Sequence, residues 1–324
     1  MEIVALHKKG ERSRVPVCVV ITSMLVLIVA SCFHSPSTPQ KGFPSPEKAV
    51  ISLVAAVRAH NEQELIAILG PGSKELISSG DEVADSTGRE KFLKAYDTMN
   101  TLQQGPANTM VLHIGADNWA MPVPIMKKGT QWIFDTGKGK EEILNRRIGR
   151  NELHVIEVLE AYVDAQHEYA TRDYGGSNRV EFAQRLISTE GDRDGLYWEA
   201  KEDREESPLG PLIARAAREG YGEASNLSPF HGYFFKILKS QGEHAEGGSY
   251  DYVVEGKMIL GFGLVAYPAE YGNSGVMTFM VNQEGTAYEK NLGKNTKRIA
   301  EDMKLYDPDK TWKKVTVEET ATQQ

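Results

Sequence analysis

Residues 139–172, GKEEILNRRIGRNELHVIEVLEAYVDAQHEYATR, carry the clearest periodic pattern in the chain. Its apolar residues are separated by three, four or seven positions, which places them on one face of an α-helix; they are Leu144, Ile148, Val155, Leu159, Tyr162 and Tyr169. A helix with one apolar stripe must bury that stripe against another element. The pattern therefore predicts a long helix that packs on a second layer.

The residues after this helix predict the layer on which it packs. Short apolar runs separated by turn residues are typical of an antiparallel sheet, and they occur at 233–238, 258–266, 276–281 and 286–289. The stretch between the helix and the sheet is polar, and it predicts two short helices, at 180–186 and 209–218. We assign residues 138–314 to one module, a long helix packed on an antiparallel sheet.

The residues before the helix, 46–137, predict a module in which helices precede strands. A helical pattern follows the N-cap residue Ser45, and residues 90–99 predict a further short helix. Apolar and polar residues then alternate over 109–134, as in strands joined by hairpins. This order of elements resembles the small fold of nuclear transport factor 2-like domains. The two modules together predict an α+β fold.

The first residues predict export. A basic start is followed by an apolar run over 15–29 and by Val29-Ala30-Ser31-Cys32. The run is shorter than the roughly 20 residues that cross a bilayer, so it is typical of a secretory signal. The last four residues resemble the lipobox of bacterial lipoproteins, in which the cysteine receives a lipid. We therefore expect a signal peptide at 1–31 and a lipid on Cys32.

The lipobox resemblance implies a protein of the cell envelope that faces the periplasm, with the membrane itself as a partner. Phe33 follows Cys32 where an Asp would resemble an inner-membrane retention signal, which favours the outer membrane. Residues 32–45 are rich in Pro and Ser and predict a lipidated tether, and residues 315–324 predict a disordered tail.

Composition excludes several classes of function. The net charge of −8 argues against binding to nucleic acid. The two cysteines are Cys18, in the predicted signal peptide, and Cys32, so a cysteine nucleophile or a cysteine zinc site is excluded for the mature chain. The sequence has neither a Gly-x-Ser-x-Gly elbow nor a Gly-rich phosphate loop. We predict no metal and no cofactor.

Three segments together identify a family resemblance: EEILNRRIGRNE at 141–152, AYVDAQ at 161–166, and YPAEYGNSGVMTF at 267–279. They resemble a family of exported bacterial proteins that is known only as a domain of unknown function, and the resemblance extends over most of the chain after the tether. The second half also resembles, more loosely, the soluble domains of pilins and pseudopilins. The first resemblance implies an envelope protein, and neither implies an activity.

Two groups of residues are candidates for a site. The carboxylates of Asp251, Glu270 and Glu289 could converge at one end of the sheet, where paired carboxylates can act on glycans; alternatively they are ordinary loop and strand-end residues. A second candidate is a loop that combines aromatic residues and glycine outside regular structure. It would bind through Tyr267, Glu270, Tyr271 and Gly272, or else form a structural corner.

A basic patch on the long helix, at Arg146, Arg147 and Arg150, has two interpretations. It could bind a partner that carries a carboxylate, or it could be a solvated face paired with nearby glutamates. The leading hypothesis for the whole chain is a non-enzymatic module that binds an envelope protein or a cell-wall component. The alternatives are a cell-wall hydrolase that uses paired carboxylates, and a structural accessory of a secretion or pilus-like system.

Overall fold

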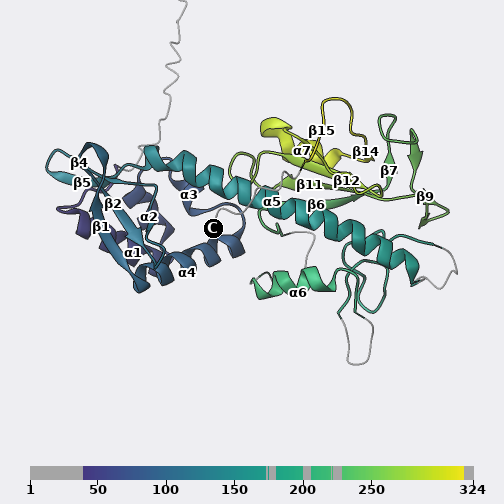
Figure 1. Cartoon of the computed structure of the whole chain (residues 1–324), viewed down its shortest axis with the longest axis horizontal. Coiled ribbons are helices and arrows are strands. Elements are labelled where there is room, and N and C mark those ends of the chain that lie inside the picture. Colours follow the sequence, from purple (N-terminus) through teal and green to yellow (C-terminus); the bar gives the residue numbers. More distant parts are fainter. Residues whose placement is uncertain are drawn as a thin grey trace, which may run out of the picture. The chain divides into compact units, whose positions relative to one another are not determined.

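The computed structural model describes residues 39–172, 174, 180–199, 206–219, 221 and 228–316, all within one compact unit. The predicted signal peptide, Cys32 and the last eight residues of the predicted tail lie outside the described residues. The described chain mixes helices with antiparallel sheets, which confirms the predicted α+β class (Figure 1).

Four helices open the fold, and polar caps decide where they start. α1 (Pro46–Arg58) begins after Ser45, whose hydroxyl accepts a hydrogen bond from the Lys48 amide, as predicted. α2 (Glu62–Leu69) follows after a break and is capped by Asn61. α3 (Lys74–Ile77) is a single turn. α4 (Glu82–Thr98) is capped by Asp81 and starts eight residues before the helix that we predicted at 90–99.

The first sheet follows directly. Its strands are β1 (Asn100–Gln104), β2 (Thr109–Ile114), β3 (Trp119–Ala120), β4 (Ile125–Lys128) and β5 (Gln131–Phe134), and a 3-10 turn at Pro106–Asn108 joins the first two. The strand order is β1-β2-β4-β5, all antiparallel, and β3 pairs with β2. Leu112, Ile125 and Phe134 are buried against α1 and α2. The predicted meander is confirmed, with β1 as an additional strand that is polar and exposed.

α5 (Thr136–Thr171) is the predicted long helix. Val155, Leu159, Tyr162 and Tyr169 of the predicted stripe are buried. They pack on Leu264, Ala266, Phe279 and Val281 of the second sheet. In the described part of the chain, no helix combines the length and the apolar character needed to cross a membrane.

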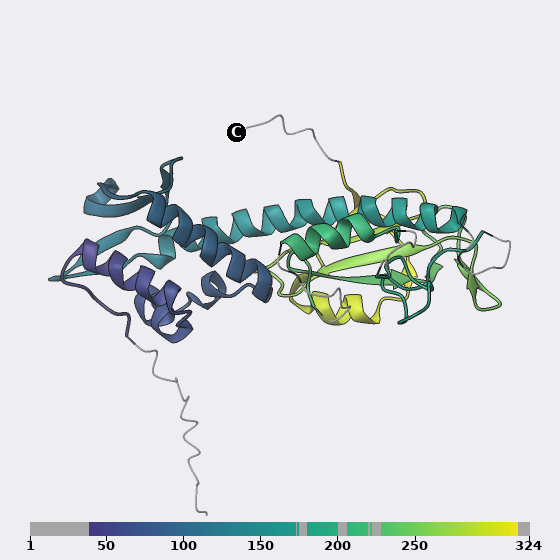
Figure 2. The same cartoon turned by 90° about the horizontal axis from the view of Figure 1, so that it is seen from below.

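The second sheet contains β6 (Tyr233–Leu238), β11 (Gly263–Pro268), β12 (Thr278–Asn282), β13 (Tyr288–Lys290) and β15 (Lys313–Lys314), in the antiparallel order β15-β13-β12-β11-β6. It lies between α5 and α7 (Thr296–Asp302), as Figure 2 shows. Alternate residues of β11 face the two layers, so all six are buried. A packed helix and a sheet buried on both faces confirm the predicted arrangement.

Smaller elements complete this half of the chain. β7 (Ser240–Gln241), β8 (Tyr250–Asp251) and β14 (Leu305–Tyr306) form a three-stranded sheet, and β9 (Val253–Val254) pairs with β10 (Lys257–Met258). A 3-10 turn at Gly293–Asn295 precedes α7. α6 (Gly210–Arg218) confirms the second of the two predicted short helices.

Two local predictions were wrong. Residues 180–186 are not helical, because the Phe182 amide pairs with the Met258 carbonyl, and the Gln166 side chain bonds both backbone groups of Ala183. The run at 258–266 is not one strand, because Gly261 has a φ of 151° and turns the chain between β10 and β11. A Cβ at Gly261 would lie 2.9 Å from the Tyr252 ring, so only glycine fits there.

Candidate functional site

The family segments on α5 and in the loop before β12 are in direct contact. Asn151 Nδ2 donates to the Ser274 carbonyl at 2.9 Å. Glu152 Oε1 accepts from the amides of Val276 and Met277 at 2.9 and 3.0 Å. Hydrogen bonds that backbone amides donate to a carboxylate are among the stronger ones in proteins. The loop is therefore fastened to the long helix.

This anchoring bears on the predicted binding loop. Tyr267 belongs to β11, is only 7 % exposed, and packs against the Phe234 ring. Glu270 is exposed, and its Oε2 accepts from Asn273 Nδ2 at 2.8 Å. Tyr271 donates its hydroxyl to Asn291 Oδ1, and Gly272 takes a φ of 77° in the turn. These four residues therefore lie in a corner of the chain. Tyr267 is buried and Tyr271 is partly exposed, so the two tyrosines do not form one exposed surface.

The three candidate carboxylates do not come together. Asp251 pairs with Ser240, beyond the last residue of β6. Glu270 follows β11, whose last residue, Pro268, pairs with Tyr233 at the start of β6. Asp251 and Glu270 therefore lie at opposite ends of the sheet. The expected convergence was wrong because the register of β6 and β11 separates the two.

Glu289 lies in the middle of β13, opposite Phe279 of β12 on one side and Lys313 of β15 on the other. Burial, and then the neighbouring charge of Glu152, raise the pKa of its carboxyl above the usual range. Because Glu152 is already bonded to two backbone amides, this pair is explained by the packing of the loop on α5. Glu152 is therefore not a second carboxylate that is free to act together with Glu289.

The buried carboxylate of Asp81 joins the helices of the first half to the second half. Its Oδ1 accepts from the Ala84 amide at 2.9 Å and so caps α4. Its Oδ2 accepts from the Tyr221 hydroxyl and the Gly232 amide, each at 2.8 Å. Asp81 is 1 % exposed, so these bonds replace water completely. The segment around residue 231 is thereby held against the start of α4.

A cavity of about 680 Å³ lies between α4 and α5, and we call it the α4–α5 cavity. Its volume falls within the roughly 300–1,000 Å³ of small-molecule sites. One part of its lining is apolar: Leu53, Val57, Leu65, Leu69, Leu76, Ile77, Phe92, Trp119, Met121, Val123 and Ile143. The other part is polar: Asp85, Arg89, Lys91, Arg147, Arg150, Asn151, His154, Glu219, Tyr221 and His231, with Ser79 and Thr87 beside them.

The polar part of this cavity contains buried atoms without partners. Arg89 Nε, His154 Nδ1 and Glu219 Oε2 are each buried and make no hydrogen bond. His231 Nε2 lies 3.0 Å from Glu219 Oε2, but the orientation of the two groups does not form a hydrogen bond. Because nearly all buried polar groups in proteins are paired, three such atoms around one cavity indicate a place for a polar group of another molecule.

The two histidines of the cavity are neutral at neutral pH. Their rings are 4.1 Å apart. Burial lowers the pKa of His154. Burial, and then the proximity of His154 and Arg215, lower the pKa of His231 to about 3. A neutral imidazole has one donor and one acceptor nitrogen, so both rings can bind polar atoms without adding charge.

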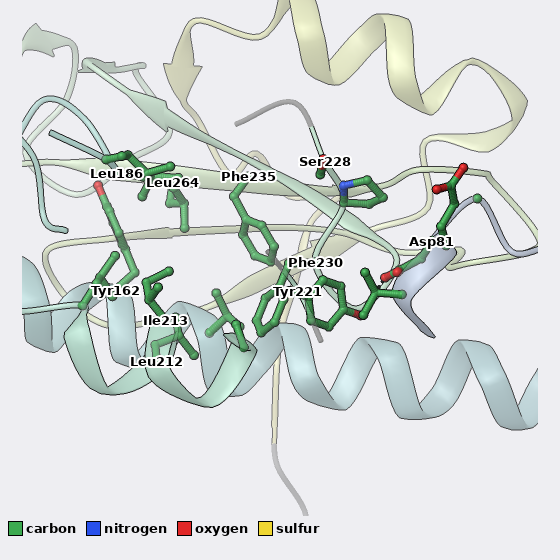
Figure 3. A pocket seen from close by; sticks show the side chains of 18 residues that line it. Asp81, Tyr162, Leu186, Leu212, Ile213, Tyr221, Ser228, Phe230, Phe235 and Leu264 are labelled. Carbon is green, nitrogen blue, oxygen red and sulfur yellow. Dashed lines mark hydrogen bonds between the residues drawn. The ribbon is translucent and has the colours of Figure 1, made fainter. Parts of the chain in front are cut away.

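A second cavity, of about 540 Å³, lies between α6 and the second sheet, and we call it the α6 cavity (Figure 3). Leu212 and Ile213 of α6 face Phe235 and Leu264 of the sheet across it. Its buried polar side chains, Asp81 and Tyr162, are already bonded. Asp81 accepts three hydrogen bonds, and the Tyr162 hydroxyl donates to the Gly263 carbonyl while accepting from Gln166.

The residues that line both cavities lie within the part of the chain that matches a known family. Residues 40–315 match the family described as protein of unknown function DUF2950. The chain belongs to this family. The match confirms the resemblance that the three segments carry. No curated protein and no solved structure matches the chain.

Sequence reasoning found only part of the site of this DUF2950 protein. Arg147 and Arg150 were singled out as a basic patch, and His154 follows them at a spacing that keeps all three on one side of α5. Arg89 and His231 carry no such signal, because α4 buries no residue fully and His231 lies in a turn. Arg146, the third member of the patch, pairs with Glu142 outside the cavity.

Proposed function

We propose that this protein is a lipid-anchored binding protein of the bacterial envelope, and that its ligand is a small molecule held in the α4–α5 cavity. The observation that carries the proposal is the group of three unpartnered polar atoms around a cavity of ligand size. Apolar walls with a few convergent polar groups are typical of small-molecule sites. The lipid anchor is supported by the sequence Val29-Ala30-Ser31-Cys32 and by the Pro- and Ser-rich segment after it.

Binding fits the site better than catalysis. The candidate carboxylates are separated by the register of the sheet or bonded to backbone amides. The two cavity histidines are neutral, and among the described residues neither forms a hydrogen bond with a serine or threonine hydroxyl that could act as a nucleophile. The polar atoms of the cavity are therefore suited to hold a ligand in place.

The cavity can be filled without disturbing the fold, which gives a direct test. Gly88 lines the cavity in the middle of α4, and a Cβ added there would meet no atom within 4 Å. Gly149, in α5, is equally unobstructed but lies outside the cavity. Gly88→Phe therefore places a phenyl ring beside the cavity without a clash at its Cβ, and Gly149→Phe is its matched control. Neither change is expected to destabilise the protein, because glycine is a poor helix former.

The experiment compares the wild type, Gly88→Phe, Gly149→Phe and Cys32→Ser after expression in bacteria. Native mass spectrometry should show a small molecule bound to the wild type and to Gly149→Phe, and none bound to Gly88→Phe. The fluorescent probe 1-anilinonaphthalene-8-sulfonate, added to protein from which small molecules have been removed, should show the same order. Cys32→Ser should lose the mass of the attached lipid and leave the membrane fraction.

Two results would contradict the proposal separately. If Gly88→Phe binds the cellular molecule and the probe as well as Gly149→Phe does, the α4–α5 cavity is not a binding site. If Cys32→Ser keeps the same mass and stays in the membrane fraction, the chain is not anchored through a lipid on that residue.

A further inference from the structure

We infer that the ligand of the α4–α5 cavity is an amphipathic anion. Its carboxylate or phosphate head is bound by Arg89 and Arg150, and its apolar tail lies against the buried core that α1, α2 and the first sheet form. This inference rests on the proposed binding function and specifies the chemical class of its ligand.

The charge of the cavity is opposite to that of the protein. Four cationic side chains line it, Arg89, Lys91, Arg147 and Arg150, against the two carboxylates of Asp85 and Glu219. The chain as a whole carries a net charge of −8. Lys91 and Arg150 are exposed and Arg89 and Arg147 are partly buried, so an excess of two positive charges at this site attracts anions from solution.

Three of these cations, Arg89, Lys91 and Arg150, have no ion pair or hydrogen bond among the described residues, and the two arginines among them can each bind a head group through two parallel hydrogen bonds. Arg147 is occupied, because its Nη1 donates to the Glu75 carbonyl at 2.6 Å and to Asn273 Oδ1 at 2.5 Å. Arg89 extends from α4 and Arg150 from α5, so the two approach the cavity from different helices.

Neither carboxylate of the cavity forms an ion pair with Arg89 or Arg150 among the described residues. Asp85 is bonded to Ser79, whose amide and hydroxyl each donate to it at 2.8 Å. Glu219 lies beside His231, with 3.0 Å between its Oε2 and the ring Nε2. An arginine that has no carboxylate partner in the protein is suited to pair with a carboxylate or phosphate of a ligand, through two parallel hydrogen bonds.

The apolar walls specify the rest of the ligand. Leu65, Leu69 and Val123 line the cavity and belong to the buried core of the first half. Phe92, Met121 and Ile143 are partly buried and pack against that core. A small inorganic anion would leave the exposed parts of Phe92, Met121 and Ile143 in contact with water, whereas an alkyl chain would bury them. Charge and shape together point to an alkyl carboxylate or alkyl phosphate.

The test uses four probes on the full chain carrying Cys32→Ser, which removes the attached lipid. They are dodecanoate, dodecyl phosphate, dodecanol and inorganic phosphate, titrated by calorimetry below the concentration at which they form micelles. We expect either anionic alkyl probe to bind at least about tenfold more tightly than dodecanol, because a charge-assisted pair with arginine contributes that much. Inorganic phosphate alone should bind weakly, and the tighter of the two anionic probes identifies the head group.

Variants assign the effect to the two arginines. Arg89→Gln and Arg150→Gln should each weaken binding of the better anionic probe by about tenfold and leave dodecanol unchanged. Arg146→Gln is the matched control, since Arg146 lies on α5, pairs with Glu142 and does not line the cavity. Thermal unfolding should show no loss of stability in either test variant, because neither arginine has an ion pair or a side-chain hydrogen bond in the part of the chain that the structure describes.

The outcomes separate this inference from the proposed function. If dodecanol binds as tightly as the anions, and binding depends on Gly88→Phe but not on the arginines, the cavity binds a neutral molecule and the inference is wrong while the function stands. If the anions bind and the arginine variants weaken them, but Gly88→Phe has no effect, the anion site is on the surface and both are wrong. If no probe binds, both are wrong as well.

Discussion

The two cavities differ in whether the buried polar groups around them have hydrogen-bond partners, although Tyr221 lines both. In the α6 cavity, Asp81 and Tyr162 have all the partners that their positions allow. In the α4–α5 cavity, buried atoms of Arg89, His154 and Glu219 have none. Arg215 Nε and Thr278 Oγ1 are also buried without a hydrogen bond among the described residues, but they line neither cavity. The grouping of three such atoms around one cavity is therefore what indicates a role other than stability.

The largest effect is expected at Asp81, which lines the α6 cavity and accepts a hydrogen bond from Tyr221, the residue that lines both cavities. Asp81→Ala removes the cap of α4 and leaves the Tyr221 hydroxyl and the Gly232 amide without their acceptor. Losing a buried, hydrogen-bonded carboxylate should lower the free energy of unfolding by about 3 kcal/mol. Urea denaturation followed by far-UV circular dichroism measures this loss.

The neighbouring residue gives the control for that change. Glu82 is exposed and forms no hydrogen bond or ion pair among the described side chains, so Glu82→Ala should change the free energy of unfolding by no more than about 0.5 kcal/mol. If Asp81→Ala is as mild as Glu82→Ala, the carboxylate does not join the two halves, and the separation of the cavities does not depend on it.

A smaller effect is expected from pH, through His231. Its pKa is about 3 in the folded protein and about 6.5 in an unfolded chain. Below pH 6.5 the unfolded state therefore binds a proton that the folded state does not bind, and stability falls as the pH falls toward 3. Between pH 6.5 and 4.5 we expect the wild type to lose about 1–2 kcal/mol through this group.

The comparison that isolates His231 is His231→Asn. Residue 231 has a φ of 48°, which asparagine tolerates, and asparagine does not titrate. Carboxylates make both proteins depend on pH, so the informative quantity is the difference between their denaturation curves. If the difference in free energy of unfolding between the wild type and His231→Asn stays constant from pH 6.5 to 4.5, His231 does not bind a proton more readily in the unfolded state. Burial would then not be what keeps the ring neutral.

Much of the fold could be predicted because the elements that pack carry periodic apolar residues. α5 and β6 were predicted on that basis, and the helix after Ser45 was predicted from its cap. α4 was found only in part, because it buries no residue fully and its first two turns have no apolar period. β1 was missed for the same reason, since its residues are almost all exposed and polar.

The candidate site was harder to predict because its residues meet only in the folded chain. The arginines of α5 were visible as a patch, but Arg146 turns toward Glu142 while Arg147 and Arg150 line the cavity. His231 and Glu219 reach the cavity from a turn and from the end of α6, and no local spacing connects them with α4. For the loop at 267–272 the sequence leaves a binding loop and a structural corner equally open, because its combination of tyrosine, proline and glycine is typical of both.

The smallest effect we expect comes from filling the α6 cavity. Leu212 lies on its wall and is partly exposed, and Leu212→Phe would extend the apolar side chain into the cavity. Because the polar groups there are already paired, we expect this variant to gain up to about 1 kcal/mol of stability, measured by thermal unfolding. Leu212→Ala should have the opposite effect, because it removes apolar contact and enlarges the cavity.

Neither Leu212 variant should alter binding of dodecanoate, whereas Gly88→Phe should abolish it. This contrast tests the distinction between a cavity that is incomplete packing and one that is a binding site. If Leu212→Phe weakens dodecanoate binding as Gly88→Phe does, then Tyr221, which lines both cavities, does not separate them. The ligand would then extend through both the α4–α5 cavity and the α6 cavity.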